Sequence, residues 1–319
     1  MTGVPELVPF DLPMAVRFRG ITRRRGVLVR GPAGWGEWSP FAEYLTPEID
    51  PWWACAREAA VEGWPAPVRA SVPVNVTIPA VGPADAHARA AASGCATAKI
   101  KVAEPGQTAG EDEARVEAVR DALGTAGRIR VDANGAWPVD EAASRLATLA
   151  RYGLEYAEQP CRTVEELREL RLLLARRGVE VPIAADESIR RSGDPERVAA
   201  LGAADVAVLK VQPLGGVRAC LALAERLGMP VVVSSALETS VGIAAGLALA
   251  AALPELPYAC GLNTVPLLAA DVAVDPLVAR DGAIGVRSVV VRDVAEWSAG
   301  PEHAAAWRAR WLTMEDRPW

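Results

Sequence analysis

Short apolar runs alternate with longer amphipathic stretches through the middle of the chain. Apolar runs of about five residues are typical of buried strands, and apolar positions three or four apart are typical of helices that pack on one face. The pattern predicts eight strands, at residues 72–77, 98–102, 128–132, 154–158, 182–186, 206–210, 231–235 and 258–262. It predicts helices between them, most clearly at residues 111–123, 139–152, 164–177 and 217–227.

Eight strands separated by helices predict a closed parallel barrel. No amphipathic pattern follows the eighth predicted strand, so the expected fold is an α/β protein with a TIM-type (β/α)7β barrel that lacks its last helix. A doubly wound open sheet is the alternative architecture, but it requires a glycine-rich phosphate turn after its first strand. No GxGxxG motif occurs in the chain, which favours the barrel.

The two ends of the chain differ from the middle. Residues 20–41 predict two strands joined by a tight turn, and residues 52–63 predict a short helix. Five of the ten tryptophans lie in the first seventy residues and four lie beyond residue 295. This clustering predicts one small α+β domain built from both chain ends. The expected division is the first part of this domain at residues 1–71, the barrel at residues 72–280 and a C-terminal segment that returns to the domain at residues 281–319.

Composition and charge limit the partners of the protein. Its 34 basic residues are outnumbered by 40 acidic ones, so the net charge of -6 offers no basic surface for a nucleic acid. The longest apolar run, 241–253, is shorter than the ~20 residues of a membrane span and predicts a buried helix instead. Five scattered cysteines without a CxxC pair, and a start unlike a signal peptide, indicate a reducing cytoplasm. We expect a small-molecule carboxylate as partner; the oligomeric state is undefined, and a monomer is compatible with the sequence.

Charged side chains stand at the carboxyl ends of five consecutive predicted strands. They are, in order, Lys101, Asp132, Glu158, Asp186 and Lys210. In a barrel these ends meet at one mouth, so the two amines should face each other with the three acids between them. Three buried carboxylates need a cation, and oxygen ligands with open positions favour Mg²⁺, with Mn²⁺ as a substitute. The alternative interpretation is that the acids are unrelated helix caps and surface charges.

A cation that faces two amines suits removal of a proton next to a carboxylate, because the ion stabilises the resulting enolate. Lys99 shares a strand face with Lys101, and its ammonium would favour the neutral, proton-accepting form of Lys101. Neither of the two histidines lies at a predicted strand end, so a histidine base is not expected. Further candidates for substrate contact or support of the site are Asn134, Glu187, Ser234 and Ser235. A turn would also explain the asparagine, and a helix cap would also explain the serines.

The motifs KxK, DxN, EQP, DES and a final lysine before PLGG resemble those of the enolase superfamily, and within it the muconate-lactonizing-enzyme subgroup. The resemblance covers nearly the whole chain. It implies that Asp132, Glu158 and Asp186 bind Mg²⁺ and that Lys101 and Lys210 flank the substrate. It also implies that the terminal region is a capping domain that closes the barrel and shapes specificity.

Within this subgroup, residues 34–44, residues 234–240 and the short chain resemble actinobacterial members that form o-succinylbenzoate in menaquinone biosynthesis. These enzymes dehydrate 2-succinyl-6-hydroxy-2,4-cyclohexadiene-1-carboxylate. The resemblance implies that Lys101 removes the α-proton and then protonates the leaving hydroxyl, while charged Lys210 stabilises the enolate, partly by a cation–π contact.

Other activities remain open within the family. They are N-succinylamino acid racemisation, dipeptide epimerisation and muconate-type lactonisation. Dipeptide epimerases of the family carry an acidic DxD after the eighth strand, whereas this chain has CGLN at residues 260–263. A catalytically silent barrel that binds a carboxylate is the non-enzyme alternative, and it would be expected to have lost an acid or a lysine. None is lost.

Overall fold

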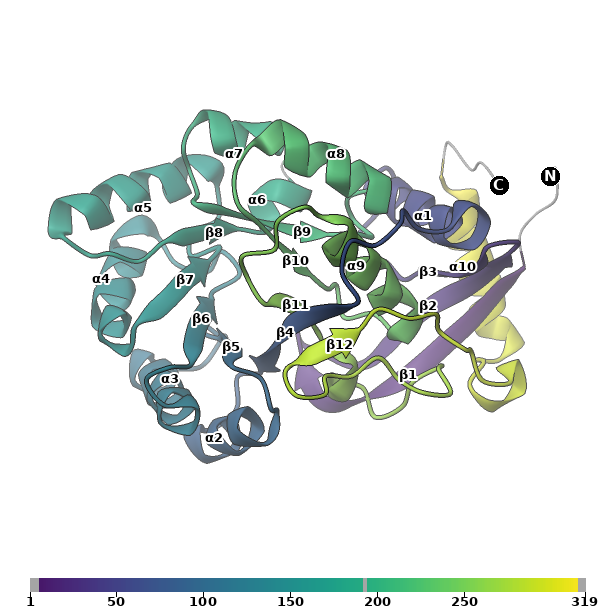
Figure 1. The fold of residues 1–319 in the computed structure, drawn as a ribbon, viewed down its shortest axis with the longest axis horizontal. Helices are drawn as coiled ribbons and strands as arrows, with labels where there is room; N and C mark the ends of the chain where they lie inside the picture. The colour runs from purple at the N-terminus through teal and green to yellow at the C-terminus, as the bar shows by residue number, and fades with distance from the viewer. Residues whose placement is uncertain (1–5, 192–193, 315–319) are drawn as a thin grey trace.

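The computed structural model describes residues 6–191 and 194–314, so the outermost residues of the predicted segments 1–71 and 281–319 lie outside the described part. A closed barrel of eight parallel strands forms its centre, as predicted (Figure 1). The barrel strands are β4 (Ser71–Ile78), β5 (Thr97–Lys101), β6 (Arg128–Asp132), β7 (Leu154–Glu158), β8 (Ile183–Ala185), β9 (Val206–Lys210), β10 (Val231–Ser234) and β11 (Cys260–Asn263). Neighbouring strands pair in sequence order, and β11 pairs with β4 to close the ring.

Helices surround the barrel (Figure 1). They are α2 (Pro83–Ala92), α3 (Ala109–Leu123), α4 (Val139–Leu149), α5 (Val164–Arg177), α6 (Glu187–Arg190), α7 (Glu196–Ala200), α8 (Val217–Leu227) and α9 (Ser240–Ala252). α9 is apolar all round and almost entirely buried, which confirms the helix predicted there. None of the helices in the described part of the chain is long and apolar enough to cross a membrane.

Two connections of the barrel depart from a regular alternation. Between β8 and β9 the single predicted helix is wrong, because the chain forms the two short helices α6 and α7 instead. Pro195 stands at the start of α7, a position that proline tolerates, whereas a proline inside one longer helix would break it. After β11 the chain forms only the 3-10 turn η3 (Val265–Leu267) before the short strand β12 (Ala283–Gly285), which pairs antiparallel with β4. The barrel therefore lacks its eighth helix, as predicted.

The capping domain contains elements from both ends of the chain. The strands β1 (Leu7–Phe18), β2 (Ile21–Gly31) and β3 (Gly34–Trp38) form an antiparallel sheet. Its remaining elements are helix α1 (Asp50–Arg57), the π-helical turn η1 (Glu58–Glu62), the 3-10 turn η4 (Val294–Glu296) and helix α10 (Pro301–Leu312). The ring of Trp38 lies 5.3 Å from that of Trp307 and 5.7 Å from that of Trp53, both edge to face. Tryptophans from both ends thus share one core, as their clustering predicted.

Strand β1 was not among the predicted elements. Pro9 and Pro13 interrupt its apolar pattern, and proline is normally a signal against a strand. β1 lies at the edge of the three-stranded sheet, where a missing N–H is tolerated. The carbonyls of both prolines accept hydrogen bonds from outside the sheet, from the N–H groups of Ala299 at 2.8 Å and Ala269 at 2.9 Å.

Two buried glutamates of the capping domain bind the N-termini of barrel helices. Glu37 accepts hydrogen bonds from the N–H groups of Thr239 and Gly242, both at 3.1 Å, at the start of α9. Glu58 accepts hydrogen bonds from the N–H group of Val217 at 2.6 Å and from that of the next residue at 3.2 Å, at the start of α8. Helix N-termini carry unpaired N–H groups and a partial positive charge, so a carboxylate there stabilises by up to ~2 kcal/mol when partly buried. These contacts join the capping domain to the helices that follow β9 and β10.

Glu238, next to this junction, makes the stability of the fold depend on pH. Burial raises its pKa from 4.5 to about 7; the charge of Glu37 adds to the effect and that of Arg24 opposes it. The folded protein therefore holds a proton on Glu238 more tightly than the unfolded chain does. The free energy of unfolding should fall as pH rises from about 4.5 to 7, by roughly 3 kcal/mol from this group. In urea unfolding at pH 5 and pH 8, Glu238→Gln should lose less stability than the unsubstituted protein, and an equal loss would contradict this assignment.

Candidate active site

Strand register brings the predicted acids and lysines together at one end of the barrel. Lys101 of β5 is paired in the sheet with Asp132 of β6, and Asp132 is paired with Glu158 of β7. Lys210 is the last residue of β9, and Asp186 directly follows β8. Because all these strands are parallel, their carboxyl ends share one mouth.

Two lysines of β5 pair with the first two acids. The Nζ atom of Lys99 lies 2.8 Å from Oδ2 of Asp132 and 2.6 Å from Oε1 of Glu158. The Nζ atom of Lys101 lies 2.5 Å from the same Asp132 oxygen and donates a hydrogen bond to Oδ1 of Asn134 at 2.6 Å. Both lysines thus reach the acids from the same strand face, as the alternation of side chains along a strand predicts.

The third acid is held from the other side of the mouth. The Nζ atom of Lys210 lies 2.5 Å from Oδ2 of Asp186, and Nε of Arg190 lies 2.9 Å from its other oxygen. The chain contains only three lysines, and every other base among its 34 is an arginine. All three lysines therefore lie at this mouth, each in contact with an acid.

Burial and charge set the protonation of the site. Burial would raise the pKa of Asp132, but two neighbouring ammonium groups outweigh it and hold that pKa well below its usual range. Burial would also raise the pKa of Asp186, but the guanidinium of Arg190 and the ammonium of Lys210 outweigh it and lower that pKa. Burial raises the pKa of Glu158 to about 7, and both aspartates add to that rise. Burial lowers the pKa of Lys210, whereas two carboxylates raise that of Lys99 well above its usual value in spite of burial.

The chemistry of the three acids fits a hard divalent cation. They are almost fully buried and offer only oxygen donors, which Mg²⁺ prefers. Burial and the charges of both aspartates raise the pKa of Glu158, and a cation bound beside it would favour its charged, metal-binding form. The acids do not converge on one point here, because lysines stand between them: among residues 6–191 and 194–314, no three acidic, histidine or cysteine side chains are grouped to hold one ion.

A small cavity at the mouth connects the lysines with the capping domain. Its lining includes Lys99, Lys101, Asn134, Lys210, Ser234 and Ser235. Phe18 and Arg19, from the turn between β1 and β2, line it from the capping side. The ring centre of Phe18 lies 5.5 Å from Nζ of Lys101. Six of the predicted site residues therefore face one shared space.

Glu187 is placed differently from the other candidates. It is absent from the cavity lining and accepts hydrogen bonds from Nη2 of Arg190 at 2.5 Å and Nδ2 of Asn134 at 3.3 Å. Asn134 adopts a positive φ of 48°, which suits its turn position before a glycine. Glu187 thus supports Asn134, which in turn contacts Lys101.

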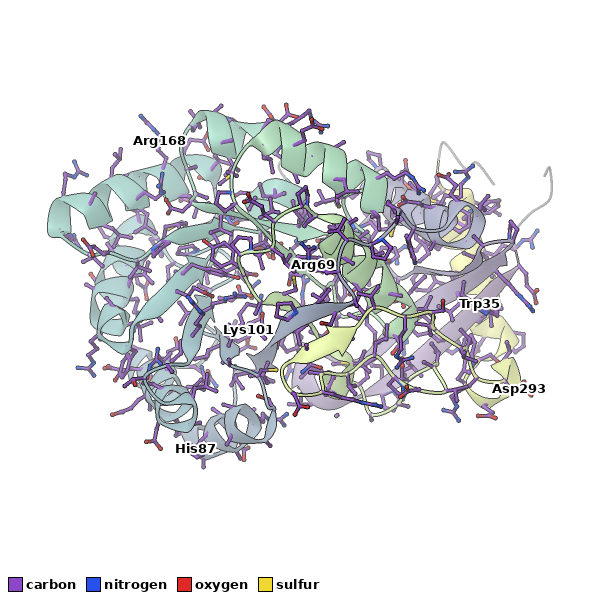
Figure 2. All side chains as sticks on the ribbon, viewed as in Figure 1. Trp35, Arg69, His87, Lys101, Arg168 and Asp293 are labelled. Carbon is purple, nitrogen blue, oxygen red and sulfur yellow. The ribbon has the colours of Figure 1, made fainter. Side chains whose placement is uncertain are left out.

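The histidines lie away from these groups. His87 is on α2, outside the barrel, whereas Lys101 ends a barrel strand (Figure 2). His87 pairs with Asp121 at 3.2 Å, and His303 of α10 lies 3.4 Å from Asp11 in the capping domain. Neither histidine lines the cavity at the mouth, which agrees with the prediction that histidine is not the base.

Gln159 belongs to the EQP motif, and the sequence predicts no role for it. Its Oε1 accepts hydrogen bonds from the N–H groups of Asp186 at 2.9 Å and Ser188 at 3.1 Å. Its Nε2 donates to Oγ of Ser188 at 2.7 Å and to the carbonyl of Cys161 at 2.9 Å. The glutamine therefore fixes the backbone that carries Asp186. The available signal was an uncharged amide between an acid and a proline at a buried strand end.

Arg190 and Tyr44 were also missed. Arg190 bonds Asp186, four residues before it, and its Nη1 donates to the hydroxyl of Tyr44 in the capping domain. The spacing of four residues was a usable signal for the arginine, because such pairs meet on one helix face. No local pattern linked Tyr44 to a residue 146 positions away.

The capped parallel barrel carries three buried acids and all three lysines at one mouth. Residues 83–289 match the family described as Enolase C-terminal domain-like, and residues 10–60 match Enolase N-terminal domain-like. The chain belongs to the enolase superfamily, as its motifs predicted.

Several curated relatives of this chain carry the name o-succinylbenzoate synthase. The relative from Thermobifida fusca is 61% identical over 97% of this chain and 98% of its own length. The relative from Mycobacterium marinum is 55% identical over 88% of this chain and 83% of its own length. The relative from Mycolicibacterium smegmatis is 53% identical over 93% of this chain and 90% of its own length. Among solved structures, the muconate lactonizing enzyme of Pseudomonas fluorescens, complexed with muconolactone, superposes with a TM-score of 0.80. It is 22% identical and covers 93% of this chain and 98% of its own, so it supports the fold alone.

Proposed function

We propose that this chain is an o-succinylbenzoate synthase, a hydro-lyase that dehydrates 2-succinyl-6-hydroxy-2,4-cyclohexadiene-1-carboxylate in menaquinone biosynthesis. Relatives that are 53% to 61% identical bear this name, and this chain covers 83% to 98% of their length. The observation that carries the proposal is the grouping of all three lysines around one cavity, each in contact with at least one of the three buried acids. A barrel that only bound a ligand would not need this complete set.

Lys101 is the proposed base and acid of the reaction. Its amine takes the proton from the carbon next to the carboxylate, which leaves an enolate. The same amine then returns that proton to the departing hydroxyl, so the C–O bond breaks and one water leaves from the same face. Asn134 and Asp132 hold the amine in place between these two transfers.

Lys210 is the proposed partner on the opposite side of the substrate. Its pairing with Asp186 favours the ammonium form, which offsets part of the cost of its burial. A fixed positive charge at this place stabilises the enolate as it forms, partly by a cation–π contact with the ring. Ser234 and Ser235 are proposed to bind the succinyl carboxylate through hydroxyl or N–H groups.

Mg²⁺ is the proposed cofactor, with Asp132, Glu158 and Asp186 as its ligands and Mn²⁺ as a substitute. When bound, it would stabilise the negative charge that the carboxylate gains in the enolate. Lys99 contacts two of these acids, so we propose that it balances their charge and supports the site from below. Glu187 is proposed to support Asn134.

The remaining proposals concern partners and place in the cell. The substrate is a small carboxylate, and no nucleic acid or membrane partner is proposed. A reducing cytoplasm suits the five cysteines, which are all buried and unpaired. We retain the division into residues 1–71, 72–280 and 281–319 as a proposal.

An assay in deuterated water tests the activity most simply. The purified protein should convert the cyclohexadiene substrate to o-succinylbenzoate, which ultraviolet absorbance follows. N-succinylamino acids in the same solvent should take up no deuterium at the α-carbon, and mass spectrometry measures this. Deuterium uptake without any dehydration would overturn the synthase in favour of a racemase.

A further inference from the structure

The wall of the cavity opposite β5 is an irregular turn. Strand β10 ends at Ser234, and the next residues, Ser235, Ala236 and Leu237, line the cavity together with Lys101. Leu237 has a left-handed backbone with φ of 66° and is buried. A leucine keeps such a conformation only when its surroundings impose it. Within the turn, Glu238 accepts a hydrogen bond from the N–H group of Ala236 at 2.7 Å, but the carbonyls of Ala236 and Leu237 are held from outside the barrel.

Arg24 of the capping domain holds these two carbonyls. Its Nε donates to the carbonyl of Leu237 at 2.7 Å, and its Nη2 lies 3.3 Å from the carbonyl of Ala236. The same guanidinium donates to the carbonyl of Ser39 at 2.5 Å and to that of Arg25 at 2.9 Å. One side chain on β2 therefore binds backbone carbonyls on both sides of the junction between the capping domain and the barrel.

The charge of Arg24 is buried at this junction. It is only 2% exposed, and burial lowers its pKa to about 10, although the carboxylates of Glu37 and Glu238 oppose that shift. Its hydrogen bonds go to carbonyls and, at 2.8 Å, to the hydroxyl of Ser39, and a planar fork of five N–H donors can bind several such oxygens at once. A lysine ammonium, as a point charge on a flexible stem, cannot reproduce that geometry.

The neighbouring arginines serve a different purpose. The side chains of Arg23 and Arg25 are 46% and 57% exposed, and both pair with Asp11 on the outside of the sheet. Only the middle residue of this arginine run reaches the barrel. Arg23 therefore offers a matched control on the same strand.

We propose that Arg24 is a positioning residue for substrate binding: from the capping domain it fixes the Ser235–Leu237 wall against which the substrate lies. The inference rests on the proposed dehydration, and it makes the capping domain part of the binding site without a direct contact between Arg24 and the substrate. Loss of the guanidinium should loosen the wall and weaken substrate binding. The proton-transfer groups, on β5 and β9, should keep their positions.

Steady-state kinetics and deuterium exchange of Arg24→Met test the proposal, with Arg23→Met as control. We expect KM for the cyclohexadiene substrate to rise about tenfold or more while kcat stays within about threefold. Amide exchange should become faster at residues 234–239 and stay unchanged in β5. Arg23→Met should match the unsubstituted protein in both measurements. Arg24→Lys, which keeps the charge but not the fork, should resemble Arg24→Met and serves as the second variant if the methionine protein does not fold.

The proposal is wrong if Arg24→Lys or Arg24→Met retains the original KM, or if exchange at residues 234–239 does not change. A fall in kcat with an unchanged KM would also contradict it, because that result places Arg24 in the chemical step. If the unsubstituted protein fails to dehydrate the substrate, the proposed function fails. The exchange experiment then still decides whether Arg24 holds the wall.

Discussion

Lys101→Ala should lower the rate of dehydration by at least ~10³-fold, because the substitution removes both the base and the acid of the proposed reaction. The fold should survive, since Asp132 keeps its contact with Lys99 at 2.8 Å and is not left without a positive partner. Steady-state assays of the purified variant measure the loss, and far-UV circular dichroism with urea unfolding checks the fold.

Lys210→Ala belongs to the same test and should cause a loss of similar size. Asp186 would retain Arg190 at 2.9 Å, so this variant should also fold. Arg162→Ala, at an exposed arginine outside the cavity at the mouth, is the control and should keep nearly full activity. Near-normal rates of dehydration in either folded lysine variant would contradict the proposed mechanism.

Removal of divalent metal is the second large effect. Treatment with a chelator followed by dialysis should reduce activity by at least ~10³-fold, because the enolate would lose its main source of charge stabilisation. Added Mg²⁺ should restore activity, Mn²⁺ should restore part of it, and Ca²⁺ should not, since its longer and more variable coordination suits the site less well. Activity assays with elemental analysis of the same samples make the measurement.

A specific result would contradict the metal assignment. If metal-free protein, confirmed by elemental analysis, retained full activity, the three acids would have to be counter-ions for the lysines and nothing more. Glu158→Gln gives a second check. It should weaken activation by Mg²⁺, whereas Glu187→Gln, which alters an acid that contacts Arg190 and Asn134 and is not a proposed metal ligand, should change the concentration of Mg²⁺ required for half-maximal activity only slightly.

The barrel and its charged mouth could be predicted because local patterns specify them. Each barrel strand is a short apolar run, and Lys101, Asp132, Glu158 and Lys210 are the last residues of their strands. Strand order then brings these ends together without further information. Strand β1 was missed for a local reason, since two prolines hide an edge strand whose pairing depends on the sheet it joins.

Contacts between distant segments could not be predicted in the same way. Arg24 lies within an arginine run on a predicted hairpin, and only the folded junction shows that its guanidinium donates to the carbonyl of Leu237, 213 residues away. Tyr44 and Arg190 meet across 146 positions. Such pairs depend on how the capping domain sits on the barrel, which no spacing in the chain encodes.

Because the chain contains only three lysines, their side-chain NMR signals test the shared metal and lysine site most directly. Protein labelled with ¹³C at the lysine ε-carbons should show three side-chain signals by NMR, one from each amine at the mouth. If the acids bound by these amines are the metal site, Mg²⁺ should shift all three signals and restore activity over the same concentration range. Lysine signals that stay unchanged while Mg²⁺ restores full activity would place the metal elsewhere and contradict the shared site.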